Sequence, residues 1–178
     1  MSRSQGNCIA DSLQVSLDYA DRLLAGISAD RFARFAAVAT GTGATRTVES
    51  NHPAFVLGHL ALYTPRIVSL LGGTPTAVPT RFEEVFSKDD TCIDDVAGTA
   101  YPPMAEVVEV FRHGCREAIA ALRAASDDVL ERNNPMRGPM AEMFPSVGSL
   151  AGFLSGGHMM MHLGQVSAWR RIEGLGPA

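Results

Sequence analysis

Cysteine is scarce in this sequence of 178 residues, and its spacing excludes two classes of small domain. Cys8, Cys92 and Cys115 are widely separated and form no C-x-x-C pair. Neither a disulfide framework nor a cysteine-ligated zinc knuckle is therefore expected, and a reducing compartment suits the chain. Residues 1–7 are polar and lead into no signal-peptide core, so we expect a cytoplasmic protein.

Charge is also sparse, and lysine is almost absent. Charged residues make up 19% of the chain, and Lys88 is its one lysine. The net charge is −4 and no segment gathers the arginines, so the sequence lacks the basic patch that nucleic-acid binding requires. Apolar residues reach 46%, enough for a sizeable core. We therefore expect a single domain over residues 1–178 and no nucleic-acid partner.

One long stretch, between Glu142 and Arg170, contains no Asp, Glu, Lys or Arg. Its length would suffice to cross a bilayer, which takes about 20 apolar residues. The stretch also contains Pro145, the pair Gly156–Gly157, two histidines and a glutamine, and a lipid-facing helix seldom carries these. The pattern favours a helix buried in a soluble protein, and no membrane partner is expected.

Apolar residues recur with helical spacing in four segments, and no convincing alternating strand pattern is present. The predicted helices lie at about residues 13–27, 51–72, 102–125 and 146–173. Leu154, Met161, Ala168 and Ile172 form the expected packing stripe of the last one. The prediction is an all-α fold, a four-helix bundle in which residues 72–100 form a long crossover linker between helices 2 and 3.

Two histidines of the fourth predicted helix, His158 and His162, have the spacing of a metal-ligand pair. Positions four apart in a helix project from the same face one turn apart, so both imidazoles can reach one ion. His59 lies in the charge-free half of the second predicted helix, and inward residues of facing helices meet in the core of a bundle. A third imidazole there would complete a site for zinc, nickel or iron with open coordination positions.

These histidines also have a structural explanation. A single histidine on an apolar helix face is more often a hydrogen-bonded core residue than a ligand. The run Met159–Met161 suggests packing, because a copper site would prefer a methionine cluster without three imidazoles.

Two further polar residues are candidates for a catalytic role. His52 lies two helical turns before His59, about 10 Å away, and cannot easily share an ion with it. It is a candidate pocket residue or general base, and the alternative is a surface residue at the helix N-terminus. Gln165 lies one turn after His162, where its amide could orient a ligand or a water; the alternative is an inter-helix hydrogen bond.

The segment Asn51-His-Pro-Ala-Phe-Val-Leu-Gly-His-Leu-Ala, followed later by His158-Met-Met-Met-His162-Leu-Gly-Gln165, resembles the DinB/YfiT-like superfamily of metalloprotein bundles over nearly the whole chain. This resemblance implies an up-down-down-up four-helix bundle, commonly a homodimer. It also implies that His59, His158 and His162 occupy the metal-ligand positions.

The same resemblance implies activity on a small-molecule substrate. Some relatives transfer a low-molecular-weight thiol, bound to the metal as thiolate, to an electrophile, and others catalyse isomerisation or hydrolysis. The competing hypothesis is a non-catalytic, dimeric metal-binding or stress-related binding module. An open coordination position would distinguish an enzyme from such a module.

Overall fold

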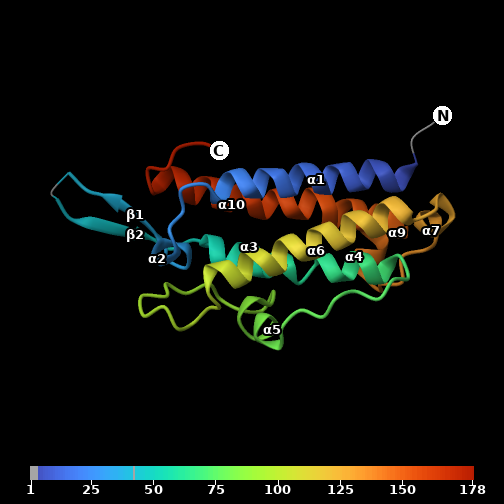
Figure 1. Cartoon of the computed structure of the whole chain (residues 1–178), viewed down its shortest axis with the longest axis horizontal. Coiled ribbons are helices and arrows are strands. Elements are labelled where there is room, and N and C mark those ends of the chain that lie inside the picture. Colours follow the sequence, from blue (N-terminus) through green and yellow to red (C-terminus); the bar gives the residue numbers. More distant parts are fainter. Residues whose placement is uncertain (1–3, 42) are drawn as a thin grey trace.

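Four helical segments run along the long axis of the computed structural model, which describes residues 4–41 and 43–178 (Figure 1). They are α1 (Gln5–Leu24), α3 and α4 (Pro53–Ala61 and Thr64–Leu70), α6 (Met104–Ala124), and α9 and α10 (Val147–Gly152 and Met159–Ile172). The connections contain four short helices: α2 (Ala29–Phe32), α5 (Thr80–Phe86), α7 (Asp127–Glu131) and α8 (Pro139–Met143). The mostly helical architecture expected from the sequence is confirmed.

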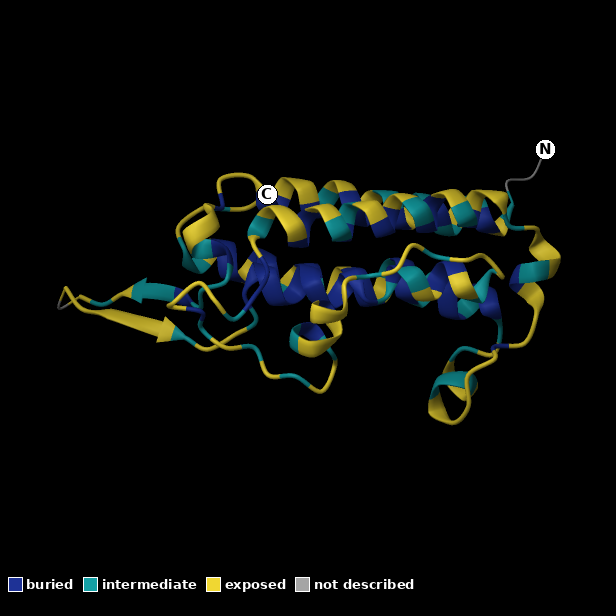
Figure 2. Cartoon of the chain, turned by 60° about the horizontal axis from the view of Figure 1, so that its bottom comes forward, coloured by how far each residue is buried: buried dark blue, intermediate teal, exposed yellow. Residues whose placement is uncertain are grey.

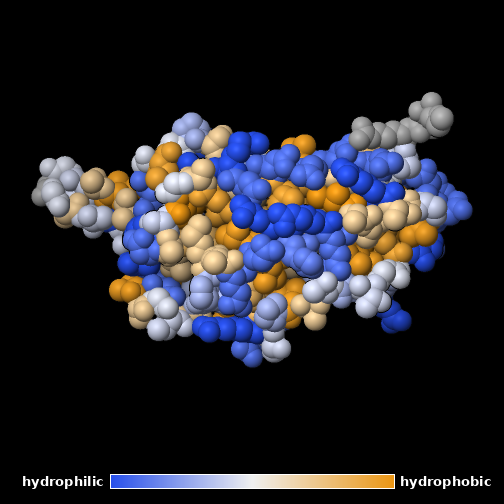
Figure 3. All heavy atoms as spheres, viewed as in Figure 1, coloured by the Kyte–Doolittle hydropathy of each residue, from blue (hydrophilic) through white to orange (hydrophobic). Residues whose placement is uncertain are grey.

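The apolar stripes of the long helices meet in one core. α6 packs against α1, α3 and α4, while α10 packs against α1 and α3. Every residue of α3 is buried, so this helix is dark blue along its length in Figure 2. Hydrophilic side chains cover much of the outward surface of α1 and α6 (Figure 3). The helix that carries His59 is therefore the most enclosed of the four segments.

A β-hairpin corrects the expectation of an all-α chain without strands. β1 (Ala36–Ala39) pairs antiparallel with β2 (Thr45–Val48), and the hairpin extends from one end of the helical body in Figure 1. Ala36 is its one fully buried residue, and the carboxylate of Glu173 accepts a hydrogen bond from the Ala37 amide at 2.8 Å. The strands were missed because each has only four residues, and neither the sequence AAVA nor the sequence TRTV alternates between apolar and polar residues over the length that marks a strand.

The second predicted helix is broken in two. Residues 62–63 form a turn between α3 and α4, and Pro65 stands in the first turn of α4. Proline has no amide hydrogen and its ring clashes with the carbonyl four residues earlier, so an unbroken helix through this position is disfavoured. The break places Tyr63 at the N-cap of α4, beside the histidines described below.

The last predicted helix contains a π-helical turn, η1 (Phe153–His158), between α9 and α10. A π-turn takes one more residue than an α-turn, so it rotates everything that follows relative to a continuous α-helix. The predicted packing stripe is therefore wrong at two positions, since Met161 is 59% exposed and Ala168 is also exposed, whereas Leu154 is buried and Ile172 packs against the core. The buried positions in α10 are instead Met159, Leu163, Val166, Ser167, Trp169 and Arg170.

The linker between α4 and α6 is ordered by buried side chains. Phe82 and Phe86 of α5 are fully buried, which fastens this short helix against α3. Further along, the carboxylate of Asp95 accepts backbone hydrogen bonds from Thr99, Ala100 and Tyr101. These contacts hold the linker along the flank of α3, where its backbone can reach the histidines.

Within residues 4–41 and 43–178, no helix combines the length and the hydropathy needed to span a bilayer.

Two glycines provide a test of the helix packing. A Cβ at Gly6 would overlap the carbonyl oxygen of Leu122 where α1 approaches α6, whereas a Cβ at Gly164 would meet no atom within 4 Å. We expect Gly6→Ala to lower the free energy of unfolding by about 1–3 kcal/mol, because the backbone of α6 cannot yield cheaply. Gly164→Ala, the matched control, should raise it by up to about 1 kcal/mol through helix propensity. Urea unfolding followed by far-UV circular dichroism measures both, and equal effects would contradict the close approach.

Candidate metal centre

His59, His158 and His162 converge on one point, as the sequence predicted. Their ring centroids are 5.6 Å apart for His59 and His158, 4.7 Å for His59 and His162, and 4.6 Å for His158 and His162. One ring nitrogen from each residue lies within 4.8 Å of those of the other two. Ligand bonds of about 2.0–2.1 Å, as to zinc, can therefore converge on a single ion after small adjustments.

Local chain geometry gives each histidine its direction. His59 points from the last turn of the wholly buried α3. His158 ends the π-helical turn, and His162 lies one turn later in α10. Because the π-turn shifts the inward face of α10 by about one residue, His162 faces the core while Met161 faces outward.

Hydrogen bonding leaves ring nitrogens of the three histidines available to an ion. The Nδ1 atom of His59 lies 2.9 Å from the carbonyl oxygen of Phe86. Since a carbonyl only accepts, this Nδ1 carries the proton, and the lone pair is on Nε2. The Nδ1 atoms of His158 and His162 are buried and have no hydrogen-bond partner among the described residues. Such buried, unpartnered nitrogens are costly without a ligand, so the donor set fits a metal ion.

The surroundings keep the three imidazoles neutral. Burial, together with the nearby His162, His59 and Arg66, lowers the pKa of His158 to about 4. Burial also lowers the pKa of His59, although its bond to the Phe86 carbonyl opposes this change. The pKa of His162 is lowered by burial and by His59. Neutral imidazole is the form that binds metal ions.

A cleft of about 490 Å³ gives access from solvent to two of the histidines, His59 and His162. It is lined by Asn51, Phe55, His59, Ser87, Lys88, Asp90, Thr91, Cys92 and His162. On the other side, the ring of Tyr63 lies 4.3 Å from that of His158 and 4.9 Å from that of His59. The site is thus enclosed by aromatic rings inside and open to small molecules outside.

Comparison with known protein families identifies the family of this chain. The family model of the DinB superfamily matches residues 33–166, about three-quarters of the chain. This chain belongs to the DinB superfamily. No curated protein and no solved structure matches it. All three histidines of the DinB site lie inside the matched region.

His52 is not a surface residue of this DinB protein, contrary to one of the two alternatives. It is fully buried and caps α3, with Nδ1 accepting a hydrogen bond from the Phe55 amide at 3.1 Å. Its Nε2 lies 3.0 Å from the carbonyl of Ile93 in the linker. Both ring nitrogens therefore bind backbone groups, and neither is free to move a proton for a substrate.

Gln165 bonds to Asn51, which lies just before the N-cap of α3, so the contact resembles the inter-helix hydrogen bond that was its alternative. Its Oε1 accepts a hydrogen bond from Asn51 Nδ2 at 3.1 Å, and its side chain acts on His162 to raise that residue's pKa. Asn51, Gln165 and His162 thus form a polar series from the cleft to the imidazoles. A role for Gln165 in catalysis stays a prediction.

Three contributors to the site were missed in the sequence. The carbonyl of Phe86 carries no sequence signal, because any residue has one. Tyr63 falls inside the second predicted helix, over residues 51–72, and the proline two residues after it was the available sign of a break. Arg66, whose guanidinium carbon lies 4.4 Å from the centre of the Tyr63 ring, stands one helical turn after it.

His52 makes the stability of the metal-free protein pH-dependent. Burial lowers its pKa from 6.5 to about 4. The unfolded chain therefore takes up the proton at higher pH than the folded chain, so stability is complete above about pH 6.5 and falls toward pH 4. Between pH 7 and pH 5 we expect a loss of about 2 kcal/mol from this residue.

Urea unfolding in the presence of a chelator measures this loss, and His52→Asn is the matched variant. The Asn side chain can still accept the Phe55 amide as an N-cap but does not titrate. The difference in unfolding free energy between the two pH values should shrink by about 2 kcal/mol in the variant. An unchanged difference would show that His52 does not titrate in this window.

Proposed function

We propose that His59, His158 and His162 bind one divalent transition metal, zinc, nickel or iron, and that the protein is a metal-dependent enzyme of the thiol transferase or hydrolase type. The observation that carries the proposal is the convergence of three neutral imidazoles, two of which, those of His59 and His162, line an open cleft. No fourth described His, Cys, Asp or Glu joins the cluster. Three protein ligands with an accessible side are typical of catalytic sites, whereas structural sites usually have four.

A divalent ion held by neutral ligands keeps its charge and lowers the pKa of a bound thiol or water, which supplies a nucleophile near neutral pH. The chain's own residues would prepare this chemistry. The Phe86 carbonyl orients His59, and Tyr63 excludes water from the inner side of the site. Asn51 lines the cleft together with His162 and donates a hydrogen bond to Gln165, so its amide can orient a small-molecule substrate such as a low-molecular-weight thiol.

The fold and assembly belong to the same proposal. We infer that the four helical segments correspond to the four-helix bundle of the superfamily, with residues 72–100 as its crossover. A homodimer is expected by resemblance alone, and sedimentation of the purified protein at high concentration would decide it.

The alternative is a non-catalytic, dimeric metal-binding module. One observation favours it: Met160 and Met161, next to His162, are 43% and 59% exposed, and apolar surface of this kind suits an interface. Turnover distinguishes the two. The enzyme hypothesis expects metal-loaded protein to accelerate either thiol addition to an alkyl halide or hydrolysis of an aryl ester. If both rates equal those of metal-free protein, the binding module is the better description.

His162→Ala tests the metal site itself. The substitution removes one of three ligands from a helix in which alanine is an excellent helix former. We expect the protein, purified without a histidine tag, to fall from about one ion per chain to nearly none by elemental analysis, since two imidazoles compete poorly with buffer. Far-UV circular dichroism should barely change.

His113→Ala is the matched control, because His113 is exposed on α6 and lies outside the cluster. It should retain the ion. Retention by His162→Ala, or equal loss in both variants, would contradict a site built from His59, His158 and His162.

A further inference from the structure

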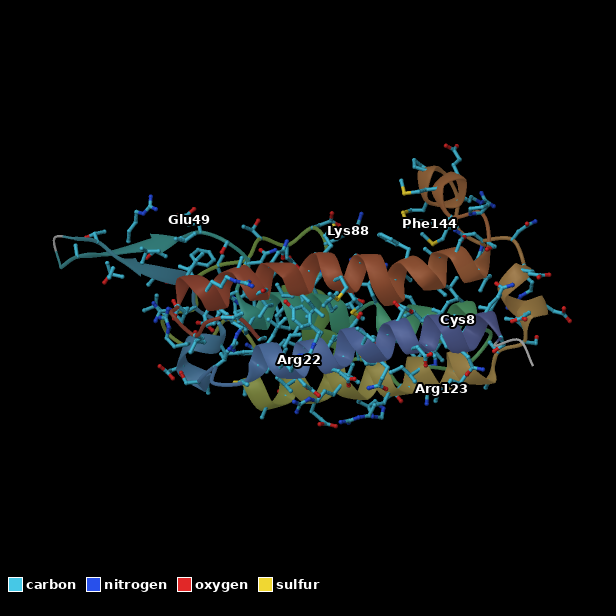
Figure 4. All side chains as sticks on the ribbon, turned by 90° about the horizontal axis from the view of Figure 1, so that it is seen from above. Cys8, Arg22, Glu49, Lys88, Arg123 and Phe144 are labelled. Carbon is cyan, nitrogen blue, oxygen red and sulfur yellow. The ribbon has the colours of Figure 1, made fainter. Side chains whose placement is uncertain are left out.

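A second cavity lies on the other side of Tyr63 from the cleft. It is a groove of about 730 Å³ bounded by α4, the start of the linker, α9 and the segment that carries α8. Figure 4 shows α8, beside the labelled Phe144, standing away from the helical body. A volume of this size is within the range of small-molecule sites. None of the three histidines lines it, so the groove is a separate compartment.

The groove walls are mainly apolar. Leu70 and Val78 line one side, and Met140, Leu150 and Leu154 line the other. Met136 also lines the groove and is 47% exposed. Unbranched, polarizable methionine side chains adapt to varied apolar shapes, which suits the binding of a flexible chain.

Charge in the groove is predominantly positive on the α4 side. Arg66 and Arg132 line it, with Glu83 as the one acidic side chain. The Arg132 guanidinium donates to the carbonyls of Val129 and Leu70, so it lies at the end of α4, one turn after Arg66. Among the described residues, no carboxylate forms an ion pair with either arginine. Ser69, which lies between Arg66 and Leu70 on α4, adds a hydroxyl to the groove lining.

We propose that this groove binds an amphiphilic carboxylate, with its apolar chain against the methionines and leucines and its carboxylate between Arg66 and Arg132. Neither guanidinium is paired with a carboxylate, so both complement an anion. Arg66 can donate paired hydrogen bonds to a planar carboxylate, and Arg132, whose Nε and one Nη already donate to carbonyls, can donate from its other Nη. The apolar chain gains free energy by leaving water, and a cationic or neutral head would lose the charge complementarity. The inference does not rest on metal binding.

The position of Arg66 connects the groove to the metal centre. Its guanidinium stacks near Tyr63, which contacts both His59 and His158. The positive charge of Arg66 also lowers the pKa of both histidines. A carboxylate bound to Arg66 therefore lies next to the wall of the candidate site, as a substrate or a regulator would.

Isothermal titration with decanoate, decanol and decyltrimethylammonium, each below its micelle concentration, tests the proposal on the full chain. Decanoate should bind at least about tenfold more tightly than either of the others, since a charge-assisted hydrogen bond contributes roughly 1.5–3 kcal/mol. Arg66→Gln should weaken decanoate binding by a similar factor and leave decanol unchanged. Ala77→Trp, at an exposed position of the groove wall, should block all three by filling the space.

Arg22→Gln is the matched control, because Arg22 also lies over a tyrosine ring, at 5.5 Å from the centre of Tyr19, but outside the groove. It should bind decanoate like the wild type. Equal binding of the three amphiphiles, no binding, or equal effects of Arg66→Gln and Arg22→Gln would overturn the proposal. A change in sedimentation on adding decanoate would also overturn it, because it would show that a second copy of the chain covers the groove.

Discussion

The π-helical turn η1 decides which side of α10 faces the core, and the metal centre depends on it. Its geometry is supported from α1: the Ser16 hydroxyl donates to the carbonyl of Ser155 at 3.2 Å, and Gly156 leaves room for the Ser12 side chain. A widened turn has irregular backbone hydrogen bonding, so a donor from a neighbouring helix stabilises it. If the same sequence continued through residues 153–158 as an ordinary α-helix, Met161 would face His59 in place of His162.

The long linker is part of the site rather than a mere connection. Its helix α5 buries Phe82 and Phe86, and the Phe86 carbonyl then holds His59 in the tautomer whose Nε2 is free. Further along, the Ile93 carbonyl holds His52 in the same way at the start of α3. Both ends of α3 are thus oriented by linker backbone. Displacing the linker would release the helix cap and a metal-site histidine together.

Tyr63 lines the groove and contacts His59, which lines the cleft, and these two cavities differ in chemistry. The cleft that reaches His59 and His162 carries amides and the Lys88 and Asp90 side chains, whereas the groove beyond Tyr63 is apolar with an arginine pair. Burial keeps the histidines neutral, and Arg66 acts in the same direction. Arg66 lines the groove and lies over the ring of Tyr63, which contacts His59 and His158.

The sequence by itself determined the helical class, the boundaries near Pro103 and Ser146, and the three histidines, because helical periodicity, capping residues and i, i+4 spacing are local properties. It could not determine the rotation of α10, since a π-turn is chosen by packing against α1 and leaves the local pattern almost unchanged. The hairpin was too short to produce a pattern. The roles of the Phe86 carbonyl, His52, Tyr63 and Arg66 were decided by tertiary structure alone, because each depends on a partner far away in the chain or on a break in a helix.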